Sequence, residues 1–193
     1  MNNFIFADPN RCIGCRACEI ACVLAHSPED ALRTGSLAQS FNPRLKVVKT
    51  RTISVPIQCR QCDNAPCANV CPSKGIVNKN NTIQINPDAC IGCKNCIIAC
   101  PFGAIEFVPQ MFEGEKLKQT GLKVIDEDGG ESDKDRIVAL KCDLCIDRPE
   151  GPACAGICPT DAFKPIVGEV ITKNVKKRRT ASAVEMSRIS FKE

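Results

Sequence analysis

The chain has 193 residues, which is enough for one substantial domain or two small ones, and it contains eight phenylalanines but no tryptophan or tyrosine. A conventional aromatic core would be thin at this size, so the sixteen cysteines are the expected source of cohesion. The formal charge of +4 counts those cysteines as neutral, and thiolates that bind metal would reverse its sign, so the apparent basicity does not indicate nucleic-acid binding.

The beginning of the chain has neither a basic stretch nor a long apolar run, and no segment reaches the roughly 18 apolar residues that cross a bilayer. We therefore expect a cytoplasmic protein without a membrane span. Thiols stay reduced in that compartment, so a disulfide scaffold is disfavoured and metal ligation is favoured.

The predicted elements are short and alternate with cysteine motifs, which is typical of an α+β protein with long loops. A short helix is expected from about Cys18 to Ala25. Strands are expected at residues 4–8, 45–49, 52–55, 75–77, 82–85, 101–107, 137–140 and 160–167.

The cysteines fall into four groups of four, with none left over. In chain order the groups are Cys12, Cys15, Cys18 and Cys22; Cys59, Cys62, Cys67 and Cys71; Cys90, Cys93, Cys96 and Cys100; and Cys142, Cys145, Cys154 and Cys158. The third follows the C-x2-C-x2-C-x3-C-P pattern that holds [4Fe–4S] clusters. Zinc sites use separated cysteine pairs and do not need the additional cysteine two residues later, so iron–sulfur clusters are favoured over a zinc-bound structural module.

In such motifs the first three cysteines bind one cluster and the fourth binds the cluster of a paired motif. The second and third motifs are adjacent and have ferredoxin-like spacing, so they should pair, and the first and fourth then pair by elimination. The predicted ligand sets are Cys59, Cys62, Cys67 with Cys100; Cys90, Cys93, Cys96 with Cys71; Cys12, Cys15, Cys18 with Cys158; and Cys142, Cys145, Cys154 with Cys22.

The pairing predicts two interlocked bacterial ferredoxin-like units. Residues 59–108 form the central two-cluster unit, while residues 1–58, with the first motif and a strand insertion, pair with the fourth motif in 137–172. Residues 109–136 are expected to be an acidic exposed loop. The basic segment 173–193 is equally compatible with a frayed tail and with a helix that docks on a partner or a neighbouring copy to build a higher-order assembly.

From Phe4 to about Val167 the motifs resemble the four-cluster ferredoxin subunits of the dimethyl sulfoxide reductase superfamily. The segments Cys12–Glu19, Cys59–Cys62, Ala65–Pro72 and Lys141–Cys145 are most similar to the small subunits of formate hydrogenlyase and of hydrogen-dependent carbon dioxide reductase. The resemblance implies four [4Fe–4S] clusters. It also implies electron transfer between a formate dehydrogenase-type molybdenum or tungsten subunit and a hydrogenase or another ferredoxin-like subunit.

No catalytic residue is predicted, because nucleotide-binding loops and nucleophile–histidine pairs are absent from the sequence. The only histidine, His26, could hydrogen-bond near a cluster or pass protons, but a surface or helix-end role is favoured. Arg16 and Lys94 occupy the same motif position and could raise a local reduction potential, or could be solvated surface charges. The alternative to a complex subunit is a free, soluble polyferredoxin that shuttles electrons.

Overall fold

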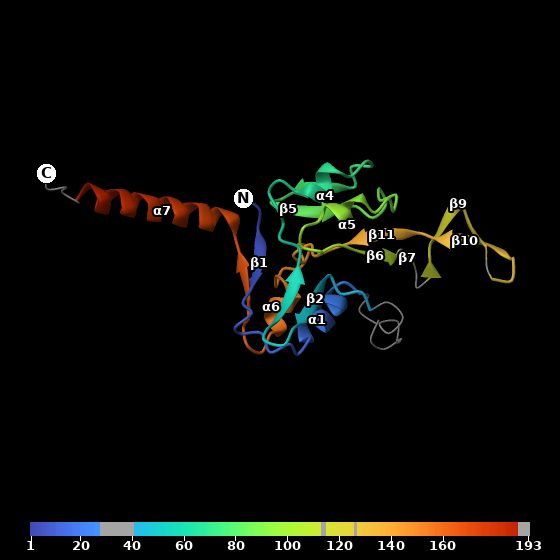
Figure 1. Ribbon diagram of the computed structural model, residues 1–193, viewed down its shortest axis with the longest axis horizontal. Coiled ribbons are helices and arrows are strands. Elements are labelled where there is room, and N and C mark those ends of the chain that lie inside the picture. The colour runs from blue at the N-terminus through green and yellow to red at the C-terminus, as the bar shows by residue number, and fades with distance from the viewer. Residues whose placement is uncertain (28–40, 113–114, 126, 189–193) are drawn as a thin grey trace.

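Short antiparallel strand pairs carry most of the regular structure in this computed structural model, which describes residues 1–27, 41–112, 115–125 and 127–188 (Figure 1). The strands are β1 (Phe4–Ala7), β2 (Leu45–Lys49), β3 (Ser54–Gln58), β4 (Ile76–Lys79), β5 (Thr82–Ile85), β6 (Glu106–Pro109), β7 (Met111–Phe112), β8 (Glu115–Lys116), β9 (Lys118–Ile125), β10 (Glu131–Asp135), β11 (Ile137–Leu140) and β12 (Phe163–Ile166). The helices are α1 (Ala17–Ala25), α4 (Pro66–Asn69), α5 (Asn95–Ala99), α6 (Ala153–Ile157) and α7 (Gly168–Ser187). The elements that separate the cysteine motifs are therefore close to those expected from the sequence.

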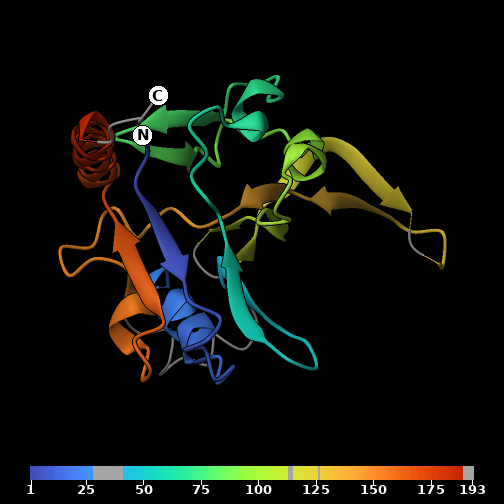
Figure 2. The ribbon, with the colours of Figure 1, turned by 60° about the vertical axis from the view of Figure 1, so that its left-hand side comes forward.

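Segments from the two ends of the chain lie side by side. Strand β1 pairs with β12 in antiparallel register, with Phe4 opposite Ile166, and α1 packs against α6 (Figure 2). The amide of Asp8 extends the pairing by donating to the carbonyl of Ala162 at 2.9 Å. The loops that carry the first and fourth cysteine motifs are consequently neighbours.

The buried side chains form two clusters, and cysteines belong to both. The first cluster gathers Ile5, Ala7, Cys18, Cys22, Leu45, Val47, Cys154 and Phe163 from the two ends of the chain and from β2. The second gathers Ala65, Cys67, Ile76, Ile83, Cys96, Ile105 and Ala139 around the β4–β5 hairpin and the β6–β11 pair. A buried carboxylate fastens β2 to α1, since Glu19 accepts a hydrogen bond from the amide of Val47 at 2.7 Å.

Several predicted strands differ in their bounds: β1 ends one residue earlier, β4 covers residues 76–79, and β12 covers only residues 163–166. Two further differences have a clear local cause. Strand β3 begins at Ser54 rather than at residue 52, because the amide of Thr50 donates to the carbonyl of Ile53 and closes a turn there. Strand β6 begins at Glu106 rather than at residue 101, because the chain turns directly after Cys100 through Gly103, whose φ is +59°.

Residues 109–136 are largely exposed, but most of them form strands rather than the predicted loop. Strands β7 and β8 pair with each other, and β9 and β10 form a longer pair that projects from the molecule (Figure 1). The acidic residues on β10 that suggested a loop lie opposite lysines, with Lys123 and Asp133 at 2.7 Å and Lys118 and Asp135 at 2.6 Å. Such cross-strand ion pairs offset the low strand propensity of aspartate. Residues 113–114 and 126 of this segment lie outside the described residues.

The basic C-terminal segment is helical as far as Ser187, and its helix, α7, begins at Gly168 rather than at residue 173. The amide of Gly168 donates to the side-chain oxygen of Asn3 at 3.1 Å, which ties the start of α7 to the residue that precedes β1. Beyond this contact the helix extends away from the rest of the chain (Figure 1). No helix among the described residues is both long and apolar enough to span a membrane. Residues 189–193 of the predicted tail lie outside the described part.

Two glycines, one in the third motif and one just after it, have positive φ angles, but a side chain would be crowded at only one of them. Gly92 has a φ of +68°, and a Cβ at this position would lie 3.0 Å from the carbonyl oxygen of Ile137. Gly103 also has a positive φ of +59°, but no atom lies within 4 Å of its virtual Cβ. A left-handed conformation costs a residue with a Cβ roughly 1–2 kcal/mol.

We predict that Gly103→Ala lowers the free energy of unfolding by about 1 kcal/mol, from backbone strain alone. Gly92→Ala should lower it further, because the added methyl group also meets a backbone oxygen. The measurement is the temperature at which anaerobically prepared protein unfolds. Equal effects of the two substitutions would contradict the contact between Gly92 and Ile137.

Candidate metal centres

Two hollows in the protein are each lined by four cysteines, and in each the fourth cysteine comes from a different motif. Cys12, Cys15 and Cys18 share one hollow with Cys158, which follows α6. Cys90, Cys93 and Cys96 share the other with Cys71, which follows α4. Both hollows are otherwise walled mainly by apolar side chains such as Val47 and Phe107, which restrict the access of water.

A third group of cysteines lies around α4. The pKa of Cys67 is raised, first by burial and then by repulsion from the Cys59 and Cys100 thiolates. The pKa of Cys62 is raised by burial and by the same two neighbours. Electrostatic effects of this kind indicate that Cys100 lies near the first three cysteines of the second motif, and they also reach across groups, since Cys67 acts on Cys96.

The fourth group surrounds α6 and is the most deeply buried. The pKa of Cys154 is strongly raised, first by burial and then by the thiolates of Cys142, Cys22 and Cys145. Burial likewise raises the pKa of Cys142, with a smaller contribution from Cys22. Cys22 therefore lies with cysteines of the fourth motif, although it is part of α1.

Several sulfur atoms accept hydrogen bonds from the main chain, as thiolates in a cluster site do. The amide of Arg44 donates to Cys22 at 3.3 Å, and the amide of Ala162 donates to Cys158 at 3.3 Å. Burial alone would raise the pKa of Cys71, but hydrogen bonds from the Ser73 hydroxyl and from nearby amides lower it. These donors stabilise negative charge on sulfur before any metal is considered.

The chemistry of these groups fits an iron–sulfur cluster. Each group offers four soft sulfur donors, and several of the thiols are buried so deeply that they ionise only with a compensating cation. Two of the sixteen cysteines, Cys15 and Cys93, are exposed, and they belong to the two walled hollows. Each hollow thus has one ligand candidate at the protein surface.

Comparisons with known proteins agree with this chemistry. A family described as a 4Fe-4S binding domain matches residues 83–106, and a second of the same description matches residues 9–22. The "Electron transport protein HydN" of Escherichia coli (strain K12) is 42% identical over 163 residues, which cover 84% of this chain and 87% of HydN. The chain belongs to the HydN family of iron–sulfur electron transport proteins.

Two further relatives from the same strain differ in how much of them the chain covers. "Hydrogenase-4 component A" is 37% identical over 199 residues, covering 95% of this chain and 91% of the relative. The "Putative oxidoreductase AegA" is 38% identical over 183 residues, but these residues make up only 25% of AegA. The chain therefore spans nearly the full length of the first two relatives and about a quarter of the third.

His26 ends α1 and lies beside the group that contains Cys22. One ring nitrogen is 2.7 Å from the carbonyl of Cys22, and the other is 3.1 Å from the carboxylate of Asp143. Arg44 forms an ion pair with the same carboxylate. Burial opposes the charged imidazolium, yet the hydrogen bond to Asp143 raises the pKa of His26 overall. His26 thus ends a helix, as the sequence favoured, and it also forms a hydrogen bond beside a cysteine group, which was the alternative; Asp143 as its partner was not predicted.

His26, Asp143 and Cys145 are close enough to bind an ion together. We do not assign them a separate metal site, because Cys145 lies with the fourth cysteine group and Nδ1 of His26 already bonds to the carbonyl of Cys22. Their role is to join the first motif to the fourth. Asp143 lies within the quoted motif, but no sequence pattern links it to Arg44, 99 positions away.

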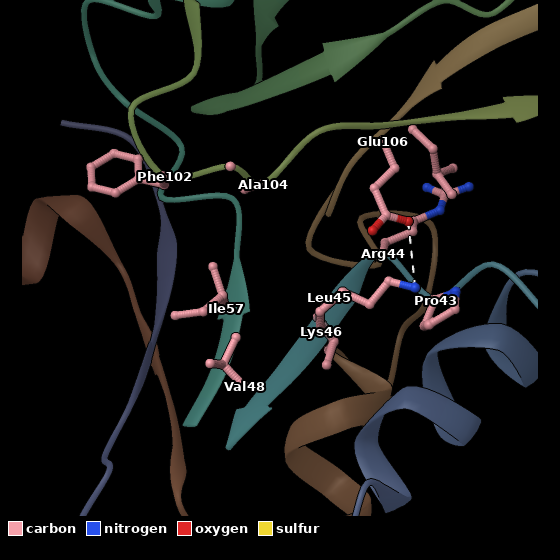
Figure 3. A pocket seen from close by; sticks show the side chains of 11 residues that line it. Pro43, Arg44, Leu45, Lys46, Val48, Ile57, Phe102, Ala104 and Glu106 are labelled. Atoms are coloured by element: carbon pink, nitrogen blue, oxygen red, sulfur yellow. Dashed lines mark ion pairs between the residues drawn. The ribbon is translucent and has the colours of Figure 1, made fainter. Parts of the chain in front are cut away.

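A further groove is lined by no cysteine, and its residues come from both the β2–β3 pair and the segment that follows the third motif. Val48 and Ile57 from the β2–β3 pair line it together with Phe102 (Figure 3). Lys46 on β2 and Glu106 on β6 meet across it at 3.5 Å (Figure 3). Both charged side chains are about half exposed, so this ion pair adds little to stability.

Arg16 and Lys94, whose φ values are +62° and +68°, directly precede α1 and α5 and are exposed.

We predict that Asp143→Asn lowers the free energy of unfolding by about 1–3 kcal/mol, because it leaves a half-buried His26 and Arg44 without their shared anion. The measurement is thermal unfolding together with iron retention under anaerobic conditions. Asp161→Asn is the matched control, since Asp161 forms an exposed ion pair with Arg11 and its loss should cost at most about 0.5 kcal/mol. Similar losses in the two variants would contradict a joining role for Asp143.

Proposed function

We propose that the sixteen cysteines hold four [4Fe–4S] clusters in crossing ligand sets. The sets are Cys12, Cys15, Cys18 and Cys158; Cys22, Cys142, Cys145 and Cys154; Cys59, Cys62, Cys67 and Cys100; and Cys71, Cys90, Cys93 and Cys96. The observation that carries the proposal is the lining of the two hollows, each by three cysteines of one motif and the last cysteine of another. A cluster of this kind supplies one-electron redox chemistry when bound.

The architecture that goes with these sets is two interlocked ferredoxin-like units. Residues 59–108 form the central unit, and residues 1–58 pair with residues 137–172 to form the other. The β1–β12 pairing, the contact between α1 and α6, and the first buried cluster support this division. Strand β11, at the start of residues 137–172, instead pairs with β6 and adds Ala139 to the buried cluster of the central unit. Residues 109–136 and 173–193 then lie outside both units.

The residues of this chain bind, shield and orient, and we assign none of them a catalytic role. Backbone amides and hydroxyl groups stabilise thiolate charge, apolar walls restrict water, and His26, Asp143 and Arg44 hold the first motif against the fourth. Exposed Cys15 and Cys93 mark the two sets that we infer to face redox partners. The use of all sixteen thiols as cluster ligands favours a reducing compartment, and we propose the cytoplasm.

The partners we propose are a formate dehydrogenase-type catalytic subunit with molybdenum or tungsten, of the dimethyl sulfoxide reductase superfamily, and a hydrogenase or another ferredoxin-like subunit. The protein would carry single electrons between them. Its similarity to an electron transport protein and to a hydrogenase component over nearly their whole lengths supports a role as a subunit. The exposed helix α7 is a candidate contact for a larger assembly.

We predict about 16 iron atoms and 16 sulfide ions per chain in anaerobically purified protein. The crossing of ligands is tested by double variants, because substitutions in one cluster site are not additive. Cys22→Ser and Cys145→Ser should together remove no more iron than either alone. Cys22→Ser and Cys15→Ser should remove iron additively. The reverse pattern, with Cys22 coupled to Cys15, would overturn the crossing sets.

The subunit role predicts that the protein, purified anaerobically at native concentration from its own host, elutes with molybdenum or tungsten. The isolated complex should reduce a viologen dye with formate and with hydrogen. Cys15→Ser and Cys93→Ser variants provide the control, since the complex should still assemble while electron passage between the two ends slows. A fully loaded protein that elutes alone would instead support a free shuttle.

A further inference from the structure

A buried lysine lies at the boundary between the two units. Lys141 lies between the last residue of β11 and Cys142, and only 4% of its surface is exposed. Its ammonium donates to the carbonyl of Cys142 at 3.0 Å and to the carbonyl of Ile83. Within the described residues no carboxylate forms an ion pair with it.

A second buried side chain, Gln61, binds the same two residues. Its amide nitrogen donates to the carbonyl of Cys142 at 2.8 Å, and its amide oxygen accepts from the backbone of Ile83 at 2.7 Å. The main-chain amide of Gln61 also donates to the sulfur of Cys59 at 3.4 Å. Lys141 and Gln61 therefore form one polar seam between the second and fourth motifs.

This seam separates two of the four ligand sets. The main-chain amide of Gln61 contacts the sulfur of Cys59 in one set, and the side chain of Gln61 contacts the carbonyl of Cys142 in the other. The ammonium of Lys141 binds that same carbonyl. Lys141 therefore touches the backbone of the set that contains Cys142 and lies beside Gln61, which reaches the set that contains Cys59 and Cys67. Neither set includes an exposed cysteine.

A buried ammonium that has only carbonyl partners is unfavourable, because carbonyl dipoles replace hydration incompletely and supply no countercharge. Two anionic cluster sites, one on each side, would supply that charge. The same attraction acts on the clusters, since a nearby cation in a medium of low polarity favours whichever redox state is more negative. The reduced state carries one more electron and is therefore the one that Lys141 favours.

We propose that Lys141 tunes electron transfer: its ammonium raises the reduction potentials of two clusters, the one held by the set with Cys67 and the one held by the set with Cys142. No bond forms or breaks; each reduction adds one electron to a cluster. The inference rests on the ligand sets proposed above. It makes these two clusters easier to reduce than they would be without the lysine.

The test is a potentiometric titration of the full-length, anaerobically purified protein with dithionite as reductant, followed by electron paramagnetic resonance. In Lys141→Met two of the four potentials should shift to more negative values, and the other two should change less. Lys141→Arg keeps the charge and should retain potentials near those of the unmodified protein. Lys79→Met removes a charge from an exposed lysine on β4 and should leave all four potentials unchanged.

Unchanged potentials in a fully loaded Lys141→Met protein would overturn the proposal, as would an equal shift of all four. Loss of iron from Lys141→Met with retention in Lys141→Arg would support the proposal. Loss of iron from both variants would contradict it, because the shape of the side chain rather than its charge would then be what the site needs. Gln61→Glu provides a second measurement, because a carboxylate beside the ammonium should shift the same two potentials negatively. Fewer than about 16 iron atoms in the unmodified protein would refute the ligand sets instead.

Discussion

The repulsion among buried thiolates is the constraint on which the rest of this structure depends. Cys18, Cys22 and Cys154 belong to one buried cluster and Cys67 and Cys96 to the other, so the sulfur atoms occupy places that aliphatic side chains fill in most proteins. Burial raises the pKa of several of them, and their mutual charge adds to the cost of ionisation. A cation bound between them would offset that cost, so metal binding would stabilise the fold.

The remaining polar groups in the interior serve the same electrostatic end. Backbone amides donate to sulfur, His26 and Arg44 share the charge of Asp143, and Lys141 is buried without a carboxylate partner within the described residues. In a chain of ordinary composition these would be unfavourable choices. Next to the four anionic cluster sites proposed above, these groups would balance charge. Cohesion from the cluster sites would also compensate for a core that contains few aromatic side chains.

Much of this arrangement could be predicted from the sequence because cysteine spacing reports geometry directly. The widened gap before Cys67 and the replacement of proline by Val23 after Cys22 did not obscure the four groups. The β9–β10 pair was missed because it is held by ion pairs between residues that individually favour loops. Lys141 and Gln61 were missed for another reason. Their significance lies in burial and in the partners Ile83 and Cys142, which no local pattern reveals.

The pairing of β1 with β12 also has a consequence for synthesis. The ribosome makes Phe4 early, but its partner Ile166 is made some 160 residues later, so β1 waits unpaired for most of translation. The stretch from Cys59 to Cys100 is complete well before that time. With the ligand sets proposed above, both central sets have all their cysteines by then, and only the packing of β11 against β6 and of Ala139 in the core must wait. The sets formed by the two ends would be complete only after Cys158 has been added. A cell that makes this protein would then have to keep the thiols of the first motif reduced and free of wrong metals during that interval.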